Sequence, residues 1–333
     1  MSGGFARVAG IAGGYVEARI LQAAVRLGVF DALQHHTADA AALAADVGAD
    51  ARAMGLLLEA LVVLGLLDRD GAGYRLNDLS ATYLASASSR DFSGMVRFDA
   101  LSWDAWGKLE DAVRDGRPAR VPDMYQQDEA ETAIFINAMD SLVKARGDAE
   151  AVADLLELSQ ARRLLDIGPG PATYPIALCR RYPELHATLY DLPGTLRVTE
   201  RYVAGSEVAA RMECVAGDYR RDAVPGGHDV IFLSNIIHGE DHATNQALVE
   251  KLSGALVPGG RLVIKDHILG GSRAETDAGT VFSLLMLLTT EGGRCYTRED
   301  VTGWFERGGL TDAGRIELPP PFTSSLAIGR KPL

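Results

Sequence analysis

The chain has 333 residues, 47% of them hydrophobic, and a formal net charge of −12. This length suggests about two domains with real cores. The acidic balance argues against sequence-independent binding to nucleic acid or anionic membranes, which needs clustered Lys and Arg. The three cysteines lie far apart in neither a disulfide nor a zinc pattern, so we expect a cytoplasmic protein. No apolar run approaches the ~20 residues of a membrane span.

The first 90 residues read as three helices and a hairpin. Helical periodicity predicts helices over 15–34, from Thr37 to about Val47, and over 51–65 with Asp50 as its N-cap. The segment LLDRDGAGYRL then places two short apolar pieces around a Gly-rich turn, which predicts a β-hairpin. This order is typical of a winged helix.

A winged helix can bind DNA or serve as a dimerisation domain. The segment 51–65, where a recognition helix would lie, carries Arg52 and Glu59 but is otherwise mostly Ala and Leu. It lacks the polar and basic face that reading a DNA groove requires. The sequence therefore favours dimerisation.

A helical stretch follows over 92–116, broken by 117–122, and helices resume over 133–143 and 149–158. Aromatic and Met side chains at helical spacing are usually core. Ligand pockets, however, are apolar and often lie between domains. Phe135 and Met139 are therefore candidate substrate-binding residues.

From residue 163 the pattern alternates between strands and helices. The predicted strands are Arg163–Ile167, Ala187–Tyr190, Met212–Val215, Asp229–Leu233, Arg261–Lys265 and Ser324–Gly329. This alternation predicts an α/β fold with a mostly parallel sheet covered on both faces.

Ligands of such sheets bind at the carboxyl ends of the strands. The first predicted strand runs into LLDIGPGPATYPIAL, a Gly-Pro-Gly-Pro turn that opens a helix and contains Gly168 and Gly170. Without Cβ atoms, such a turn lets a ligand approach the backbone. Its spacing falls short of G-x-G-x-x-G, so the motif alone is weak.

Acidic residues and a histidine follow the later strands. Asp191 lies about 20 residues past the glycines, where a carboxylate can bind a ribose diol. Asp218 follows the third strand, His238 the fourth and Asp266 the fifth. Because no basic residue accompanies the glycine turn, the pattern favours a sulfonium ligand without phosphate, S-adenosylmethionine, over a nicotinamide cofactor.

Several segments resemble, in order, the motifs of the dimeric small-molecule O-methyltransferases of plant phenylpropanoid and bacterial antibiotic pathways. They are LLDIGPGPATY, LYDLPGTL, VAGDYR, IFLSNIIHGEDHATNQALVEKLSGALVPGGRLVIKDHIL and LLTTEGGRCYTREDVTGWFERGGL. The resemblance implies a Rossmann-like seven-stranded methyltransferase domain over 159–333. A winged-helix dimerisation domain would occupy 1–90, and a helical connector over 91–158 would contribute to the substrate pocket. Residues Phe5 to Tyr15 would then touch the neighbouring subunit's substrate.

The resemblance also assigns roles to individual residues. His238 falls on the catalytic base, and Asp266 on a carboxylate that orients it. The substrate-binding set is Phe135, Met139, Asn235 and Met286. The residues that would bind S-adenosylmethionine are Gly168, Gly170, Asp191, Leu192, Asp218, Tyr219 and Ser234.

The match has two departures, which leave alternatives open. Gly239 stands where the family has an acidic residue, and Cys295 where it has a further carboxylate, with Glu240, Asp241 and Glu291 as possible substitutes. We expect no bound metal, although His238, His242 and His267 could together form a site. Carbon or nitrogen methylation within the same fold is an alternative activity, and a ligand-sensing regulator is a more distant one.

Overall fold

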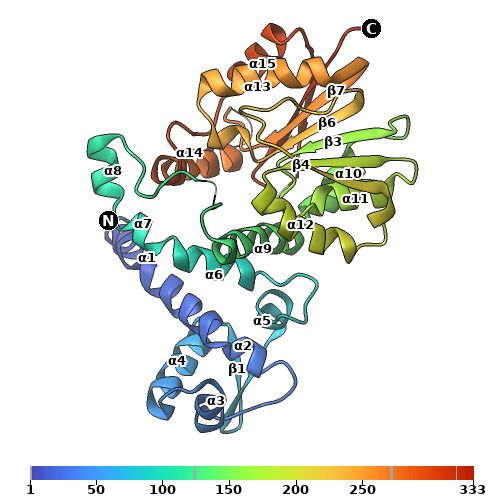
Figure 1. The fold of residues 1–333 in the computed structure, drawn as a ribbon. Coiled ribbons are helices and arrows are strands. Elements are labelled where there is room, and N and C mark those ends of the chain that lie inside the picture. Colours follow the sequence, from blue (N-terminus) through green and yellow to red (C-terminus); the bar gives the residue numbers. More distant parts are fainter. Residues whose placement is uncertain (1, 124, 271–272, 320) are drawn as a thin grey trace. The chain divides into compact units, whose positions relative to one another are not determined.

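The computed structural model describes residues 2–123, 125–270, 273–319 and 321–333 (Figure 1). It divides into two compact units. One comprises Met1–Trp103 and Asn137–Ala145, and the other comprises Asp104–Ile136 and Arg146–Leu333. Helix α9 (Glu129–Arg146) contributes to both.

The first unit has the order of elements of a winged helix. Its elements are α1 (Ser2–Leu27), α2 (Val29–Ala32), α3 (Ala40–Val47), α4 (Ala51–Val63), β1 (Leu67–Asp70), β2 (Gly73–Leu76), α5 (Asp78–Tyr83) and α6 (Ser93–Leu101). As predicted, Asp50 caps α4 by accepting a hydrogen bond from the N–H of Ala53, and β1 and β2 form an antiparallel hairpin. Phe30, Leu43 and Leu58 lie in its core.

Two helix boundaries in this unit differ from the prediction. Helix α1 begins at Ser2, not near residue 15, although its start is rich in glycine. Helix α3 begins at Ala40, because the carboxylate of Asp39, and not Thr37, accepts the hydrogen bond from the N–H of Ala42. The stretch over 92–116 is likewise three helices, α6, α7 (Trp103–Trp106) and α8 (Leu109–Asp115).

The second unit is built on a seven-stranded sheet of order β5-β4-β3-β6-β7-β9-β8. Strands β3 to β7 are parallel, whereas β9 pairs antiparallel with both β7 and β8. The strands are β3 (Arg163–Ile167), β4 (His186–Asp191), β5 (Met212–Ala216), β6 (His228–Ser234), β7 (Leu256–Asp266), β8 (Thr311–Glu317) and β9 (Ser325–Arg330). All six predicted strands are present, and β8 is additional.

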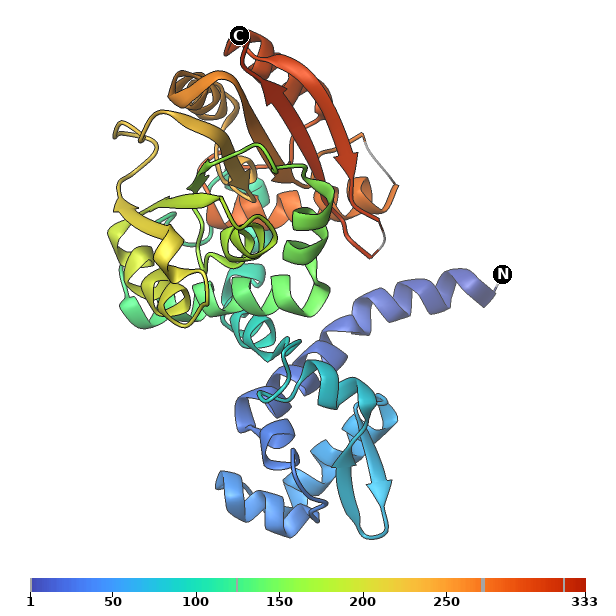
Figure 2. The ribbon, with the colours of Figure 1, turned by 90° about the vertical axis from the view of Figure 1, so that its right-hand side faces the viewer.

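Helices cover both faces of this sheet (Figures 1 and 2). Apolar side chains of β3, β6 and β7 pack against α13 (His242–Ala255) and α15 (Arg298–Arg307). On the other side lie α10 (Asp148–Leu155), α11 (Thr173–Arg181) and α12 (Pro193–Ala204). The remaining elements are α14 (Arg273–Thr289) and two single turns, η1 (Ala209–Arg211) and η2 (Ile237–Gly239). In the part of the chain that is described, no helix combines the length and apolarity needed to cross a bilayer.

Candidate active site

The glycine turn follows β3, as predicted, and its backbone is left-handed at three positions. Gly168 has φ 68°, Gly170 has φ 53° and Ala172 has φ 60°. A Cβ atom on Gly168 would collide with Cδ1 of Ile236, which belongs to the loop after β6. Glycine is therefore favoured at position 168 for two reasons, its backbone conformation and the close approach of the Ile236 side chain.

Asp191 lies at the end of β4 and is bound directly to the glycine turn. Its Oδ2 accepts a hydrogen bond from the N–H of Gly170 at 3.2 Å, and its Oδ1 accepts one from the N–H of Leu192 at 2.7 Å. Burial raises the pKa of the Asp191 carboxyl to about 6, although these hydrogen bonds favour the ionised form. The turn and the acid predicted to act together are thus neighbours.

Asp218 and Tyr219, which follow β5, form hydrogen bonds with other residues of the protein. The carboxylate of Asp218 accepts a hydrogen bond from the N–H of Arg220 at 2.9 Å. The hydroxyl of Tyr219 donates to Glu240 Oε1 at 2.6 Å, and its ring packs against the core of the sheet. Burial and the Glu240 carboxylate raise the pKa of Tyr219 well above its ordinary value. The adenine contacts expected of Asp218 and Tyr219 stay predictions.

His238 and Asp266 form a hydrogen-bonded pair across the ends of β6 and β7. Nδ1 of His238 lies 2.9 Å from Oδ1 and 3.0 Å from Oδ2 of Asp266. Asp266 is almost fully buried, and its Oδ1 also accepts from the N–H of His267 at 2.8 Å. Burial pushes the pKa of Asp266 upward, but His238 and His267 outweigh it and hold that pKa below its ordinary value.

This pairing defines the chemistry available to the imidazole. An ionised Asp266 accepts the Nδ1 proton of His238, a proton position that we assign from the hydrogen bond. The basic lone pair of the ring then lies on Nε2. The arrangement is that of a general base oriented by a carboxylate.

The turn that carries His238 is held by contacts that sequence reasoning did not identify. Asn245 of α13 donates from Nδ2 to the carbonyl of Ile237 at 2.8 Å, and the hydroxyl of Tyr296 donates to the carbonyl of Glu240 at 2.6 Å. A Cβ atom on Gly293 would collide with the carbonyl oxygen of His238. The Gly292–Gly293 pair therefore allows the loop after α14 to pack on this turn.

Two of the possible substitutes for the missing carboxylates, Glu240 and Asp241, bind other groups. Glu240 is bound by Tyr219 and by Arg220, whose Nη2 lies 2.6 Å away. Asp241 accepts from the N–H of Thr244 and caps α13. Cys295 is buried. Among the described residues, Asp266 is the carboxylate paired with His238.

Aromatic contacts beside His238 point to a residue that the prediction omitted. Phe282 of α14 stands edge-on to the His238 ring, with centroids 4.9 Å apart, and its centroid lies 5.3 Å from that of His267. Met286, predicted to bind substrate, is one helical turn further along α14 and is buried. That i, i+4 spacing was a usable signal for Phe282.

The other predicted substrate residues lie on separate elements. Phe135 stacks on Tyr125, with centroids 4.4 Å apart, in the second unit. Met139 belongs to the first unit and is half-buried. Asn235 follows β6 with φ 56°, and its N–H donates to the carbonyl of Lys265 at 2.8 Å. Such a conformation is strained for a residue other than glycine and is typical of functional sites.

A buried polar cluster surrounds Asp148 and Lys265. The hydroxyl of Tyr174 donates to Oδ2 of Asp148 at 3.3 Å. That oxygen is 2.7 Å from Arg146 Nη2 and 3.6 Å from Nζ of the fully buried Lys265. Burial lowers the pKa of Lys265. This cluster could not be predicted from the sequence because its members lie on separate elements.

The three histidines considered for a metal do not converge. Nε2 of His242 accepts a hydrogen bond from Trp304 Nε1 at 3.2 Å. The imidazole of His267 hydrogen-bonds the carbonyl of Thr323 through Nδ1. Among the described residues, no group of three or more His, Cys, Asp or Glu side chains could hold a metal ion.

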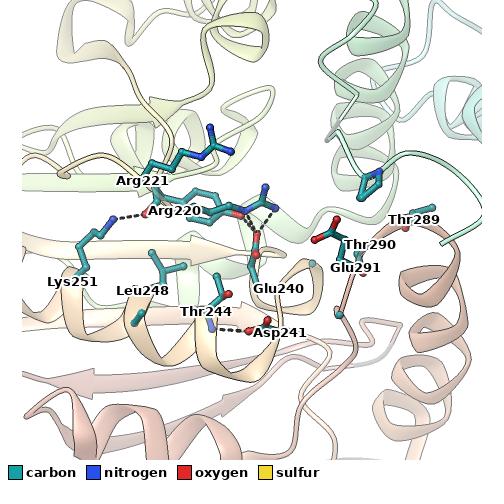
Figure 3. Close-up of a pocket in the computed structure, with 15 residues that line it drawn as sticks. Arg220, Arg221, Glu240, Asp241, Thr244, Leu248, Lys251, Thr289, Thr290 and Glu291 are labelled. Carbon is teal, nitrogen blue, oxygen red and sulfur yellow. Dashed lines mark hydrogen bonds and ion pairs between the residues drawn. The ribbon is translucent and has the colours of Figure 1, made fainter. Parts of the chain in front are cut away.

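A polar pocket of about 420 Å³ lies beside the His238 turn (Figure 3). Its walls include Arg220, Glu240 and Lys251. Two of its cations are engaged within the protein, because Arg220 pairs with Glu240 and Lys251 donates to the carbonyls of Tyr219 and Asp222. The hydrogen bonds of Lys251 therefore attach the 219–222 loop to α13. We assign no ligand to this pocket.

The fold is that of an α/β enzyme with a mostly parallel sheet, and comparison with known proteins identifies its class. Residues 106–310 match an O-methyltransferase domain, and residues 10–86 match an O-methyltransferase dimerisation domain. The chain belongs to the S-adenosylmethionine-dependent small-molecule O-methyltransferase family. It is a methyltransferase with S-adenosylmethionine as its cofactor, and the second match supports a homodimer.

Individual relatives are similar to this chain along nearly its whole length. The chain is 29% identical to the 3-hydroxy-5-methyl-1-naphthoate 3-O-methyltransferase of Streptomyces sahachiroi, over 96% of this chain and 94% of that relative. It is 30% identical to the tetracenomycin polyketide synthesis 8-O-methyl transferase of Streptomyces glaucescens, over 94% and 93%. The structure of human N-acetylserotonin methyltransferase in complex with S-adenosylmethionine matches with a TM-score of 0.88 and 26% identity, covering 99% of this chain and 98% of that one.

Proposed function

We propose that this enzyme methylates a phenolic hydroxyl of a small aromatic secondary metabolite, with His238 as general base. The observation that carries the proposal is the His238–Asp266 pair, which lies at the same edge of the sheet as the glycine turn and Asp191. An aromatic acceptor is further supported by the relatives, one of which is named for a naphthoate and one for a tetracenomycin polyketide.

We further propose that the residues at the strand ends bind the cofactor. Gly168 and Gly170 present backbone without Cβ atoms to its methionine portion. Asp191 and Leu192 bind the ribose, and Asp218 and Tyr219 bind the adenine. Ser234 presents its hydroxyl to the cofactor. The left-handed glycines and the half-buried carboxylate suit a ligand that carries a diol and no phosphate. When bound, the cofactor supplies an activated methyl group.

The chain must then orient the acceptor and remove its proton. A phenol has a pKa near 10, so it needs a base at neutral pH. His238 would take the proton on Nε2 while Asp266 stabilises the resulting imidazolium. Phe135, Met139, Asn235, Met286 and, newly, Phe282 are the proposed acceptor-binding residues. The edge-on Phe282 ring lies where it could pack against an aromatic acceptor.

The test uses hydroxynaphthoic acids as acceptors and a methyl-labelled cofactor. His238→Ala and His238→Gln should each lower the methylation rate by about 10²- to 10⁴-fold, the usual contribution of a general base. Asp266→Asn should reduce it by less. Binding of S-adenosylhomocysteine should stay unchanged in all three. Full activity of the His238 variants would disprove the role of His238 as general base. A label on carbon or nitrogen of the product would disprove oxygen methylation.

The assembly proposed is a homodimer without a nucleic-acid or membrane partner, located in the cytoplasm. Large apolar side chains along α1 are exposed in the single chain, namely Phe5, Val8, Ile11 and Tyr15. We propose that they are covered by the second subunit and that Phe5 to Tyr15 approach its substrate.

We also propose a division of the whole chain into three parts. These are a dimerisation domain over 1–90, a helical connector over 91–158 and a methyltransferase domain over 159–333.

A further inference from the structure

Glu240, two residues after His238, is a buried acid whose partners come from another loop of the sheet. Its Oε1 accepts hydrogen bonds from the hydroxyl of Tyr219 at 2.6 Å and from Nε of Arg220 at 2.8 Å. Nη2 of Arg220 lies 2.6 Å from the same oxygen (Figure 3). A buried carboxylate is costly to leave unpaired. These contacts therefore hold the Glu240 side chain in one position.

The contacts of Glu240 join two loops that follow non-adjacent strands. Tyr219 and Arg220 follow β5 at one edge of the sheet, whereas Glu240 follows β6 and the η2 turn. Strands β4 and β3 lie between β5 and β6. The loop after β5 is itself attached to α13, because Nζ of Lys251 donates to the carbonyls of Tyr219 and Asp222. Glu240 is thus bound to a loop that is held in place.

The main chain between His238 and Glu240 has little rigidity of its own. The η2 turn has three residues, and its last residue, Gly239, lies between the two. The φ of Gly239 is not left-handed, and a Cβ atom there would meet no atom of a non-neighbouring described residue within 4 Å. Neither conformation nor space therefore requires glycine at this position. Without a side chain, its backbone is more flexible than that of other residues.

The turn is anchored on both sides of this glycine. Before it, the imidazole of His238 pairs with Asp266. After it, the carbonyl of Glu240 accepts from the hydroxyl of Tyr296 at 2.6 Å, and the carboxylate of Glu240 forms the ion pair with Arg220. The ion pair is the anchor that can be removed without changing the main chain. Without it, the turn can shift and change the direction in which Nε2 of His238 points.

We propose that Glu240 is a positioning residue for the general base. Through its ion pair with Arg220 and its hydrogen bond from Tyr219, it fixes the turn on which His238 lies, and therefore the direction of Nε2. This inference rests on the proposed role of His238 as base. Glu240 acts on the turn and need not touch the cofactor or the acceptor.

The test measures turnover and cofactor binding separately in the complete enzyme. Glu240→Gln keeps the shape but loses the charge, and Arg220→Met loses the guanidinium. Each should lower kcat by about threefold to tenfold, the range of one hydrogen bond, counted per site titrated calorimetrically with S-adenosylhomocysteine. The Kd of that ligand should change less than kcat. The double variant should lose less than the two single losses combined, because the two residues form one pair.

Arg221→Met is the matched control. It removes the next cation of the same loop, whose side chain pairs with Asp218 at 3.7 Å and extends away from Glu240 (Figure 3). This variant should keep the kcat of the unmodified enzyme.

A second background shows whether Glu240 acts through His238. In His238→Gln no base is left to orient, so adding Glu240→Gln should cause no further loss of rate. Gly239→Ala restricts the backbone of the turn and should recover part of the loss in Glu240→Gln. Three results would overturn the positioning role. They are full kcat in both Glu240→Gln and Arg220→Met, a loss confined to cofactor affinity, and an equal fold loss in the His238→Gln background.

Failure of this inference can be told apart from failure of the proposed function. Full activity of His238→Gln would show that the base itself is wrong. An impaired His238→Gln beside a fully active Glu240→Gln would show that only the positioning role is wrong. Thermal unfolding of the ligand-free variants checks their folding. Arg220→Met decides the matter if Glu240→Gln is unfolded, because the Arg220 side chain is partly exposed.

Discussion

Gly168 and Gly170 differ in how much room each leaves for a side chain. The φ of 68° and the nearby Cδ1 of Ile236 both disfavour a Cβ atom on Gly168, whereas Gly170 shares only the positive φ, its nearest neighbour being Ile136 Cδ1 at 3.7 Å. We therefore expect Gly168→Ala to weaken S-adenosylhomocysteine more than Gly170→Ala in calorimetric titrations. Valine at either position should abolish binding while the dimer persists.

The comparison has an internal control. Ile236→Ala should partly restore binding in Gly168→Ala, because it removes the side chain that the new Cβ meets. It should do nothing for Gly170→Ala. Equal losses in the two alanine variants would show that the backbone conformation alone matters.

The raised pKa of Asp191 predicts pH-dependent cofactor binding. Burial places this pKa at about 6. In the proposed cofactor site, the ribose hydroxyls would donate to the ionised form. Protonation therefore competes with the ligand as the pH falls through 6. The dissociation constant of S-adenosylhomocysteine should be constant above about pH 7 and about tenfold weaker at pH 5, because one unit below the pKa corresponds to a factor of ten. Asp191→Asn should bind weakly with no such dependence.

At the scale of elements, helix α13 begins directly after the turn that carries His238, so the cap of this helix contributes to the stability of that region. The Asp241 carboxylate caps this helix three residues after His238, and its hydrogen bond to the N–H of Thr244 lowers the pKa of Asp241. Asp241→Ala should lower the free energy of unfolding by about 1 kcal/mol, and Asp241→Ser, which can still cap, by less. Urea denaturation at neutral pH measures both. Because the folded-state pKa is lowered, the difference should shrink as the pH falls through it.

The elements also show what periodicity can and cannot predict. Strands β3, β4, β6, β7 and β9 were predictable because buried strands read as apolar runs. The edge strand β5 has no buried residue, but Met212, Cys214 and Val215 keep it largely apolar. Strand β8 was not, because Thr311–Glu317 is a mostly polar edge strand with no buried residue. Its register is also interrupted between Asp312 and Gly314, where Gly314 has φ 120°. Edge strands commonly carry such irregularities.

The candidate site was predictable only in part, for the same reason. Gly170, Asp191, His238 and Asp266 follow strands that the pattern revealed, so their placement at one sheet edge was expected. The hydrogen bond from Gln126 to Thr195 and the cluster around Lys265 join residues from distant elements. Neither has a periodic pattern, so only the folded chain could reveal them.

For the whole molecule, the sheet order makes β9 essential to the second unit. This strand lies between β7 and β8, pairing with both. Removing residues 325–333 should leave β8 without a partner and expose the edge of β7. We expect the shortened chain to lose the cooperative unfolding transition of this unit, measured by circular dichroism and calorimetry. Removing only residues 331–333 is the matched control, and a cooperative transition after the longer deletion would contradict this view.

The hydrogen bond between Trp304 and His242 makes the core under α13 observable by fluorescence. The chain has three tryptophans, and Trp103 and Trp106 are partly exposed, whereas Trp304 is fully buried. Replacing the two exposed ones by Phe would leave a single emitter, with a blue-shifted spectrum in the folded enzyme. Its indole N–H donates to the imidazole of His242. The emission would therefore report the packing around His242, four residues from the proposed catalytic base.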